Sequence, residues 1–231
     1  QHHELVASAK AVKLAHEKMP GAMVGCMLAA GQYYPRTCAP EDIRAAQEAD
    51  RDNYFFTDVQ ARGAYPVWAK KRMEKAGITL HTEPGDEQVL KEGTVDFVSF
   101  SYYSSRCTTV DPELMNKANG NAIMDAVKNP YLKASDWGWA IDPVGLRYTL
   151  NHVYDRYGLP IMITENGMGA RDTLQDGRVH DDYRIQYLRE HIEQMRLAID
   201  DGVELIGYTP WSAMDLAVSY THLTLPTNSR V

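Results

Sequence analysis

One acidic residue, Glu165, stands where its carboxylate could take part in chemistry. It directly follows the apolar run 161–164, which has the length and composition of a buried strand. A carboxylate at the end of such a strand loses hydration, and this costs free energy unless hydrogen bonds or a counter-charge compensate. Such a placement usually serves a function. The alternative is a structural ion pair with Arg147 or Arg106, because ion pairs also place charged groups in buried surroundings.

Polar and aromatic groups follow two other apolar runs of the chain. Ser101-Tyr102-Tyr103 comes after residues 95–100, and Trp211 comes just after residues 203–209. Barrels of the (βα)8 type build their active sites from the C-terminal ends of several parallel strands. The competing architecture is a doubly wound open sheet, but neither G-x-G-x-x-G nor G-x-x-x-x-G-K-[ST] occurs in this sequence. The strand ends therefore favour a barrel.

The elements that would position these groups alternate between helices and short apolar strands. The strands are predicted at residues 23–28, 95–100, 161–164 and 203–209. Helices are predicted up to residue 19 and at residues 40–62, 66–76, 142–158 and 181–202. This alternation predicts an α/β fold with a parallel sheet and right-handed crossovers.

Three local patterns make this prediction specific. Asp142 is expected to cap a helix that has Pro143 in its first turn and ends at Gly158. Run 23–28 lacks alternation, which predicts a parallel strand buried on both faces. The helix at 181–202 is expected to bury an apolar seam, which consists of Ile185, Leu188, Ile192, Met195 and Ile199.

Composition excludes several classes of partner. The chain has 231 residues, 44% of them hydrophobic, and a net charge of -7 with both signs mixed along the sequence. Neither nucleic acid nor an anionic membrane is therefore expected as a partner. Cys26, Cys38 and Cys107 have no C-x-x-C spacing, which indicates neither a disulfide framework nor a zinc site and favours a reducing cytoplasm. No apolar run approaches the ~20 residues that span a bilayer, and the start at Gln1 suggests that the true beginning lies elsewhere.

The segment Ile163-Thr164-Glu165-Asn166-Gly167 matches the nucleophile motif of glycoside hydrolase family 1. Nearly the whole chain up to Leu216 resembles that family, most of all at residues 96–103, 137–143, 179–185 and 207–211. The resemblance implies a retaining β-glycosidase on a (βα)8 barrel. About four strands, the C-terminal half of that barrel, would be present and the N-terminal half missing.

The resemblance also implies roles for individual residues. Glu165 would be the nucleophile, and Tyr103 would hydrogen-bond to it and orient it. Trp211 would lie under the sugar ring and Trp139 beside the leaving group. For Tyr103 and for either tryptophan, core packing is the alternative. The acid/base carboxylate is expected in a Thr-x-Asn-Glu motif before Gln1 and hence not in this chain, and neither a metal nor a cofactor is needed.

The expected substrate is a small phosphorylated β-glucoside, because the chain is most similar to 6-phospho-β-glucosidases. Ser101 stands where enzymes on plain glucosides commonly have Asn, and Asp215 is followed by Leu216 rather than by an acidic stretch. In the phospho-enzymes a loop with Ser, Lys and Tyr holds the phosphate. That loop has no counterpart here, since no Lys follows Lys133.

Residues 1–216 are thus expected to form the barrel part, and residues 217–231 a divergent tail that is non-native or disordered. Two alternatives stay open: a β-glucosidase on plain sugars, and a non-catalytic fragment or interaction module. The fragment itself is expected to have no measurable activity and marginal stability. Its oligomeric state is open, a homo-oligomer included.

Overall fold

A four-stranded parallel sheet forms the centre of the molecule. The computed structural model describes residues 1–116 and 127–211. The strand order follows the chain, β1-β3-β5-β8, with β1 at Gly25–Ala30, β3 at Phe97–Tyr102, β5 at Ile161–Asn166 and β8 at Leu205–Tyr208. The four strands predicted from the sequence are confirmed, and so is the parallel α/β class.

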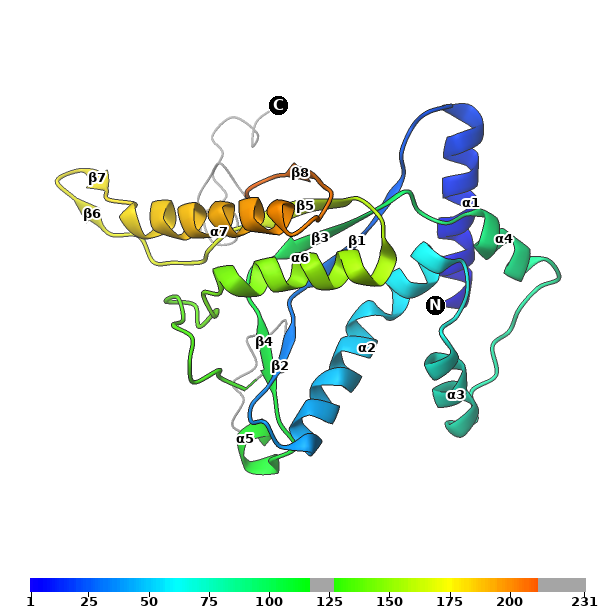
Figure 1. The fold of residues 1–231 in the computed structure, drawn as a ribbon, viewed down its shortest axis with the longest axis horizontal. Coiled ribbons are helices and arrows are strands. Elements are labelled where there is room, and N and C mark those ends of the chain that lie inside the picture. The colour runs from blue at the N-terminus through cyan, green and yellow to red at the C-terminus, as the bar shows by residue number, and fades with distance from the viewer. Residues whose placement is uncertain (117–126, 212–231) are drawn as a thin grey trace, which may run out of the picture.

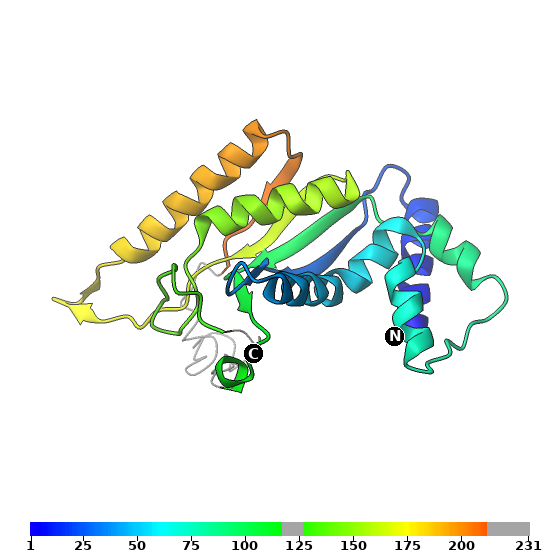
Figure 2. The same ribbon diagram turned by 60° about the horizontal axis from the view of Figure 1, so that its bottom comes forward.

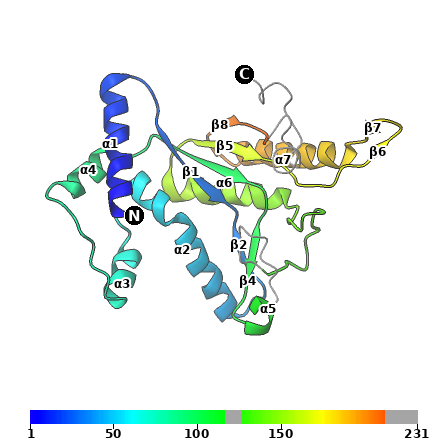
Figure 3. The same ribbon diagram turned by 180° about the vertical axis from the view of Figure 1, so that it is seen from behind.

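Helices cross over between successive strands. The helices are α1 His2–Lys18, α2 Pro40–Arg62, α3 Val67–Lys75, α4 Asp86–Glu92, α5 Pro112–Asn116, α6 Pro143–Tyr157 and α7 Asp182–Asp200. Figure 1 shows α2, α6 and α7 on one side of the sheet, and Figure 3 shows the sheet from the opposite side. The helices α4 and α5 were not predicted from the sequence.

Two small sheets extend the loops around the main sheet. Strand β2, Tyr33–Pro35, pairs in parallel with β4, Arg106–Thr108, beyond the ends of β1 and β3. The hairpin of β6, Leu174–Gln175, and β7, Arg178–Val179, leads into α7. It projects at the end of the molecule opposite to α1 (Figure 2).

The predicted caps of α6 are confirmed. The Asp142 carboxylate accepts a hydrogen bond of 2.8 Å from the Gly145 N–H, and Pro143 occupies the first turn. Gly158 ends the helix in the left-handed region with φ 61°, where a side chain would be strained.

One face of the sheet, here called the closed face, packs against the helices. Its side chains Val98, Phe100, Ile161 and Ile163 are completely buried and form a core cluster with residues of α6. The α6 residues are Leu146, Leu150 and Val153. Apolar burial of this kind is the main favourable contribution to folding.

The other face, here called the open face, has no helix layer among the described residues. It carries Met27, which is 52% exposed, and Ile206, which is 48% exposed. The prediction that run 23–28 is buried on both faces is therefore wrong. Strand β1 alternates between buried and exposed side chains, because helices cover only one of its faces.

The predicted apolar seam of α7 is also corrected by the structure. Of its five members only Met195 is buried, whereas Ile185, Ile192 and Ile199 are each about half exposed. The buried side chains are Tyr187, His191, Met195 and Ala198. Helix α7 turns this more polar side to the sheet because Tyr187 reaches a buried polar group at the end of β5. The sequence period alone gives no sign of that contact.

Candidate active site

Glu165 reaches the open face through an irregularity between β3 and β5. Phe100 pairs with Ile163 and Ser101 with Glu165, so that Thr164 is an extra residue on β5. Without this β-bulge, strict alternation from Ile161 and Ile163 would turn Glu165 to the closed face. The extra residue thus places the carboxylate opposite Ser101, where a ligand can approach it.

Two hydroxyl groups bind the Glu165 carboxylate at the same oxygen. The Ser101 Oγ donates to Oε2 at 2.6 Å, and the Tyr103 hydroxyl donates to Oε2 at 2.9 Å. Hydrogen bonds to a charged acceptor are stronger than those between neutral groups. The carboxylate is therefore held through Oε2.

The residue after Glu165 anchors the end of the strand. Asn166 is completely buried and donates through its Nδ2 to the Tyr102 carbonyl at 2.8 Å. The same side-chain amide contacts the Tyr187 hydroxyl of α7 at 3.0 Å, and its Oδ1 accepts from Tyr208 of β8 at 3.1 Å. Asn166 therefore joins β3, β8 and α7 behind the carboxylate.

The structure places the two tryptophans predicted as substrate contacts, Trp139 and Trp211, next to the ring of Tyr103. The ring of Trp139 lies 5.4 Å from that of Tyr103, and the ring of Trp211 lies 6.3 Å away, edge to face. The Trp211 backbone is held by a hydrogen bond of 2.8 Å from its N–H to the Asn166 carbonyl. A Cβ on Gly167 would come within 3.3 Å of the Trp211 side chain, so a glycine here allows the close approach.

A buried polar cluster next to the site was missed in the sequence. The Asp142 carboxylate accepts hydrogen bonds from the Tyr34 hydroxyl at 3.0 Å and the Ser105 hydroxyl at 2.6 Å, in addition to capping α6. Burial, together with the Asp142 charge, raises the pKa of Tyr34 above its ordinary value. The capping pattern predicted only one of the roles of Asp142, because β2 and the segment between β3 and β4 supply the other donors.

The two arginines considered as ion-pair partners of Glu165 make contacts with other groups. The Arg147 guanidinium pairs with Asp201 at 2.5 Å. Arg106 donates to Asn53 at 3.0 Å and to the Ala29 carbonyl at 3.1 Å. Two hydroxyl donors stand where the sequence left a salt bridge open.

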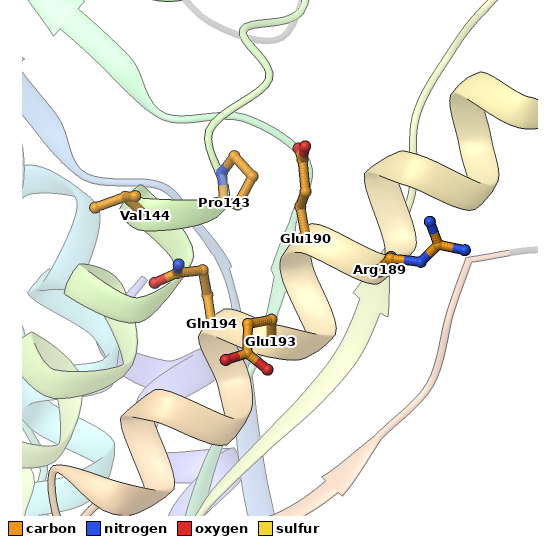
Figure 4. A pocket seen from close by; sticks show the side chains of 6 residues that line it. All are labelled: Pro143, Val144, Arg189, Glu190, Glu193 and Gln194. Carbon is orange, nitrogen blue, oxygen red and sulfur yellow. The ribbon is translucent and has the colours of Figure 1, made fainter.

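Other features of the described ranges lie apart from this group. A cavity of about 380 Å³ opens between the start of α6 and α7 (Figure 4), lined by Pro143, Val144, Arg189, Glu190, Glu193 and Gln194. In residues 1–116 and 127–211 no cluster of three or more His, Cys, Asp or Glu side chains could hold a metal ion. Within the same ranges, no helix combines the length and apolar character that crossing a bilayer requires. The predicted tail at 217–231, Asp215 and Leu216 lie outside the described residues.

Comparison with known proteins matches residues 1–223 to Glycosyl hydrolase family 1. The chain is 53% identical over 221 residues to the 6-phospho-beta-glucosidase AscB of Escherichia coli (strain K12). The matched residues make up 95% of this chain and 46% of that protein. It is also 53% identical over 221 residues to the aryl-phospho-beta-D-glucosidase BglH of Bacillus subtilis (strain 168), with 95% and 47% covered. The chain spans about half the length of the curated relatives it matches.

Solved structures give the same result for the fold. The family 1 b-glucosidase from Thermotoga maritima superimposes with a TM-score of 0.74 at 31% identity, over 91% of this chain and 46% of that one. A beta-glucosidase from Exiguobacterium marinum gives 0.74 at 30% identity, with 91% and 47% covered. These neighbours are (βα)8 barrels, so the four-stranded sheet is half of such a barrel, as predicted.

Proposed function

The chain belongs to glycosyl hydrolase family 1, and from this premise we propose that its parent protein hydrolyses 6-phospho-β-glucosides with retention of configuration. One observation carries the proposal: the Glu165 carboxylate stands at the end of a barrel strand with two hydroxyl donors on a single oxygen. This arrangement suits a nucleophile, because it fixes the carboxylate and leaves Oε1 to attack.

In the proposed reaction, Glu165 Oε1 attacks the anomeric carbon while the aglycone leaves with a proton from a second carboxylate. Water then hydrolyses the glycosyl ester, and the second carboxylate takes the proton back. Tyr103 and Ser101 hold the nucleophile during both steps, and they bind the returning charge when the ester is cleaved. Trp139 and Trp211 would offer flat apolar faces to the sugar and to the leaving group.

The acid/base carboxylate is proposed to lie outside this chain. Retaining enzymes need it ~5–5.5 Å from the nucleophile. Without it the leaving oxygen would depart as an alkoxide, and general acid catalysis is worth ~10²–10⁴-fold. We therefore propose that the 231-residue chain has no measurable glycosidase activity on its own, and that the motifs serve in a longer chain.

The phosphorylated substrate is supported by relatives and by one residue of the site. Relatives at 39–53% identity carry phospho-glucosidase or phospho-cellobiase names, while the beta-glucosidase A of Acetivibrio thermocellus is 36% identical. Ser101, the residue that distinguishes the phospho-enzymes in this position, contacts the nucleophile directly. A cytoplasmic location would suit a substrate that is phosphorylated during uptake.

The nucleophile is tested with Glu165→Gln in a chain completed by the missing barrel half. Turnover should fall by at least about 10⁴-fold, because an amide cannot form the glycosyl ester. An activated 2-fluoro sugar should label Glu165 in the unchanged protein, as peptide mass spectrometry would reveal. Glu190→Gln, on the surface of α7, is the control and should keep full activity. Labelling of another residue would mean that Glu165 is not the nucleophile.

Substrate choice is tested separately in the same completed chain. Its kcat/KM for a 6-phosphorylated nitrophenyl β-glucoside should exceed that for the plain glucoside by ~10²-fold or more, since each charge-assisted contact contributes ~1.5–3 kcal/mol. Similar values for both sugars would favour the plain β-glucosidase and leave the nucleophile assignment untouched.

A further inference from the structure

Trp139 is carried by a short hairpin, residues 133–141, here called the tryptophan hairpin. At its base the Ile141 N–H donates to the Lys133 carbonyl at 2.9 Å, and nearer its tip the Ser135 N–H donates to the Trp139 carbonyl at 2.8 Å. An antiparallel bridge lies between these two bonds. The backbone at Trp139 is therefore fixed relative to the base of the hairpin, and a shift of the base moves the tryptophan.

The residue that follows the tryptophan hairpin, Asp142, is buried and joins four groups. Its Oδ2 accepts from the Ser105 hydroxyl at 2.6 Å and from the Tyr34 hydroxyl at 3.0 Å. Its Oδ1 accepts from the Gly145 N–H at 2.8 Å, and its carbonyl accepts from the Tyr102 hydroxyl at 2.9 Å. The cap of α6 accounts only for the bond to Gly145, whereas the other three bonds tie the base of the hairpin to β2, β3 and the segment after β3.

That segment after β3 contacts the tryptophan hairpin a second time. The Ala140 N–H donates to the Ser104 Oγ at 3.1 Å, and the Ser104 hydroxyl donates to the Ser105 carbonyl at 2.9 Å. Both serines follow directly after Tyr103, whose ring lies 5.4 Å from that of Trp139. Two adjacent serines thus link the tyrosine that binds Glu165 to the hairpin that carries Trp139.

We infer that Asp142, together with Ser105 and Tyr34, positions Trp139 for the leaving group of the substrate. These three residues are here called the Asp142 cluster. The inference rests on the proposed function, in which Trp139 contacts an aromatic or sugar leaving group through its flat face. A buried carboxylate suits this task, because it holds several hydroxyl donors at once through charge-assisted hydrogen bonds that water does not screen. Asp142 acts through Trp139 and is therefore a positioning residue.

The first experiment separates the leaving-group side of the site from the nucleophile. In the completed chain, Glu165 is trapped as a 2-fluoroglycosyl ester, and recovery of activity is followed in water alone and with phenyl β-glucoside as acceptor. Water or the acceptor hydroxyl attacks the anomeric carbon, the bond to the Glu165 carboxylate breaks, and the acid/base carboxylate takes up the proton. Only the acceptor occupies the place of the leaving group.

Ser105→Ala and Tyr34→Phe each remove one donor to Asp142 and keep the cap of α6. Each should raise the acceptor concentration for half-maximal recovery about 10-fold, while recovery in water alone changes by less than about 2-fold. Slower recovery in water to the same extent as with the acceptor would overturn the inference, because the cluster would then act on Glu165.

Thr109→Val is the matched control. The Thr109 hydroxyl is as buried as that of Ser105 and donates at 2.8 Å to the carboxylate of Asp42, in the first turn of α2. The variant therefore loses the same kind of bond at another helix and should leave both recoveries unchanged. A loss of acceptor binding equal to that of Ser105→Ala would overturn the inference in favour of a general effect on folding.

Hydrogen exchange in the completed chain tests the positioning role without any activity. The amides of Ala140 and Ile141 should exchange faster in the two cluster variants than in the unchanged protein, and at the same rate in the control variant. Unchanged exchange in both cluster variants would overturn the role of Asp142. Failure of the 2-fluoro sugar to label Glu165 would contradict the proposed function and the leaving-group role with it, and exchange would still decide whether Asp142 positions the hairpin.

Discussion

The two faces of the central sheet come from the same four strands but differ in how deeply their side chains are buried and in where polar groups lie. On the closed face, Phe100 and Ile163 are completely buried against the helices. On the open face, Met27 and Ile206 are about half exposed, and the polar side chains of the site gather at the strand ends. Burial therefore concentrates stability on one face, while the other keeps groups that a ligand can reach.

The extra residue Thr164 in β5 turns the Glu165 side chain from the closed face to the open face. Ile161 and Ile163 point to the closed face, and Glu165 would follow them there without the bulge at Thr164. A carboxylate among Phe100 and its neighbours would be desolvated and out of reach. The strand period alone therefore does not assign a functional side chain to a face, since a single inserted residue reverses the face.

The largest expected effect is a difference in unfolding free energy between a truncation on the closed face and one on the open face. Phe100→Ala on the closed face should cost about 3–5 kcal/mol of unfolding free energy, because it leaves a cavity in a fully buried cluster. Met27→Ala on the open face should change it by no more than about 0.5 kcal/mol. Urea unfolding followed by circular dichroism measures both. Equal costs would mean that the open face is buried in the single chain.

A smaller effect should appear when one hydroxyl is removed from Glu165, the proposed nucleophile. In a completed chain, Ser101→Ala should lower kcat about 10–100-fold with little change in KM, since a hydrogen bond to a charged group is worth ~1.5–3 kcal/mol. Ser101→Thr keeps a hydroxyl and should restore most of the rate. Ser99→Ala is the matched control, because Ser99 lies two residues earlier and donates to the Cys26 carbonyl instead. Equal losses for Ser99→Ala and Ser101→Ala would argue for a purely structural role.

Much of the fold could be predicted because its signals are local. The cap at Asp142, the glycine at Gly158 and the four apolar runs each depend on a few neighbouring residues, and the structure confirms them. The exposure of Met27 could not be read from its own segment. It depends on whether a second layer covers the sheet, which a short apolar run does not encode.

The site could be predicted in part for a similar reason. The family resemblance of residues 96–103 implied a hydrogen bond from Tyr103 to Glu165, and the Tyr103 hydroxyl donates to that carboxylate in the structure. The bond from Ser101 was missed because the bulge sets the register between β3 and β5, and nothing in the sequence of either strand announces it. The contacts of Tyr187 were missed because they join elements far apart in the chain.

The smallest expected effect is a pH dependence on the closed face, at His191. This side chain is completely buried, its ring is stacked on that of Tyr187 at 3.8 Å, and its Nδ1 contacts the Tyr187 carbonyl at 2.7 Å. Burial lowers the pKa of His191 below the ordinary value, more than the carbonyl contact raises it. The folded chain thus keeps the ring neutral, while the unfolded chain takes up a proton near pH 6.5. Stability should therefore fall as the pH drops through about 6.5, by up to ~1.4 kcal/mol for each pH unit until the folded state also binds the proton.

Urea unfolding between about pH 5 and 7.5 measures the slope, which should flatten in His191→Phe and persist in the exposed control His3→Gln. A slope that disappears in His3→Gln, or persists in His191→Phe, would place the titrating group elsewhere.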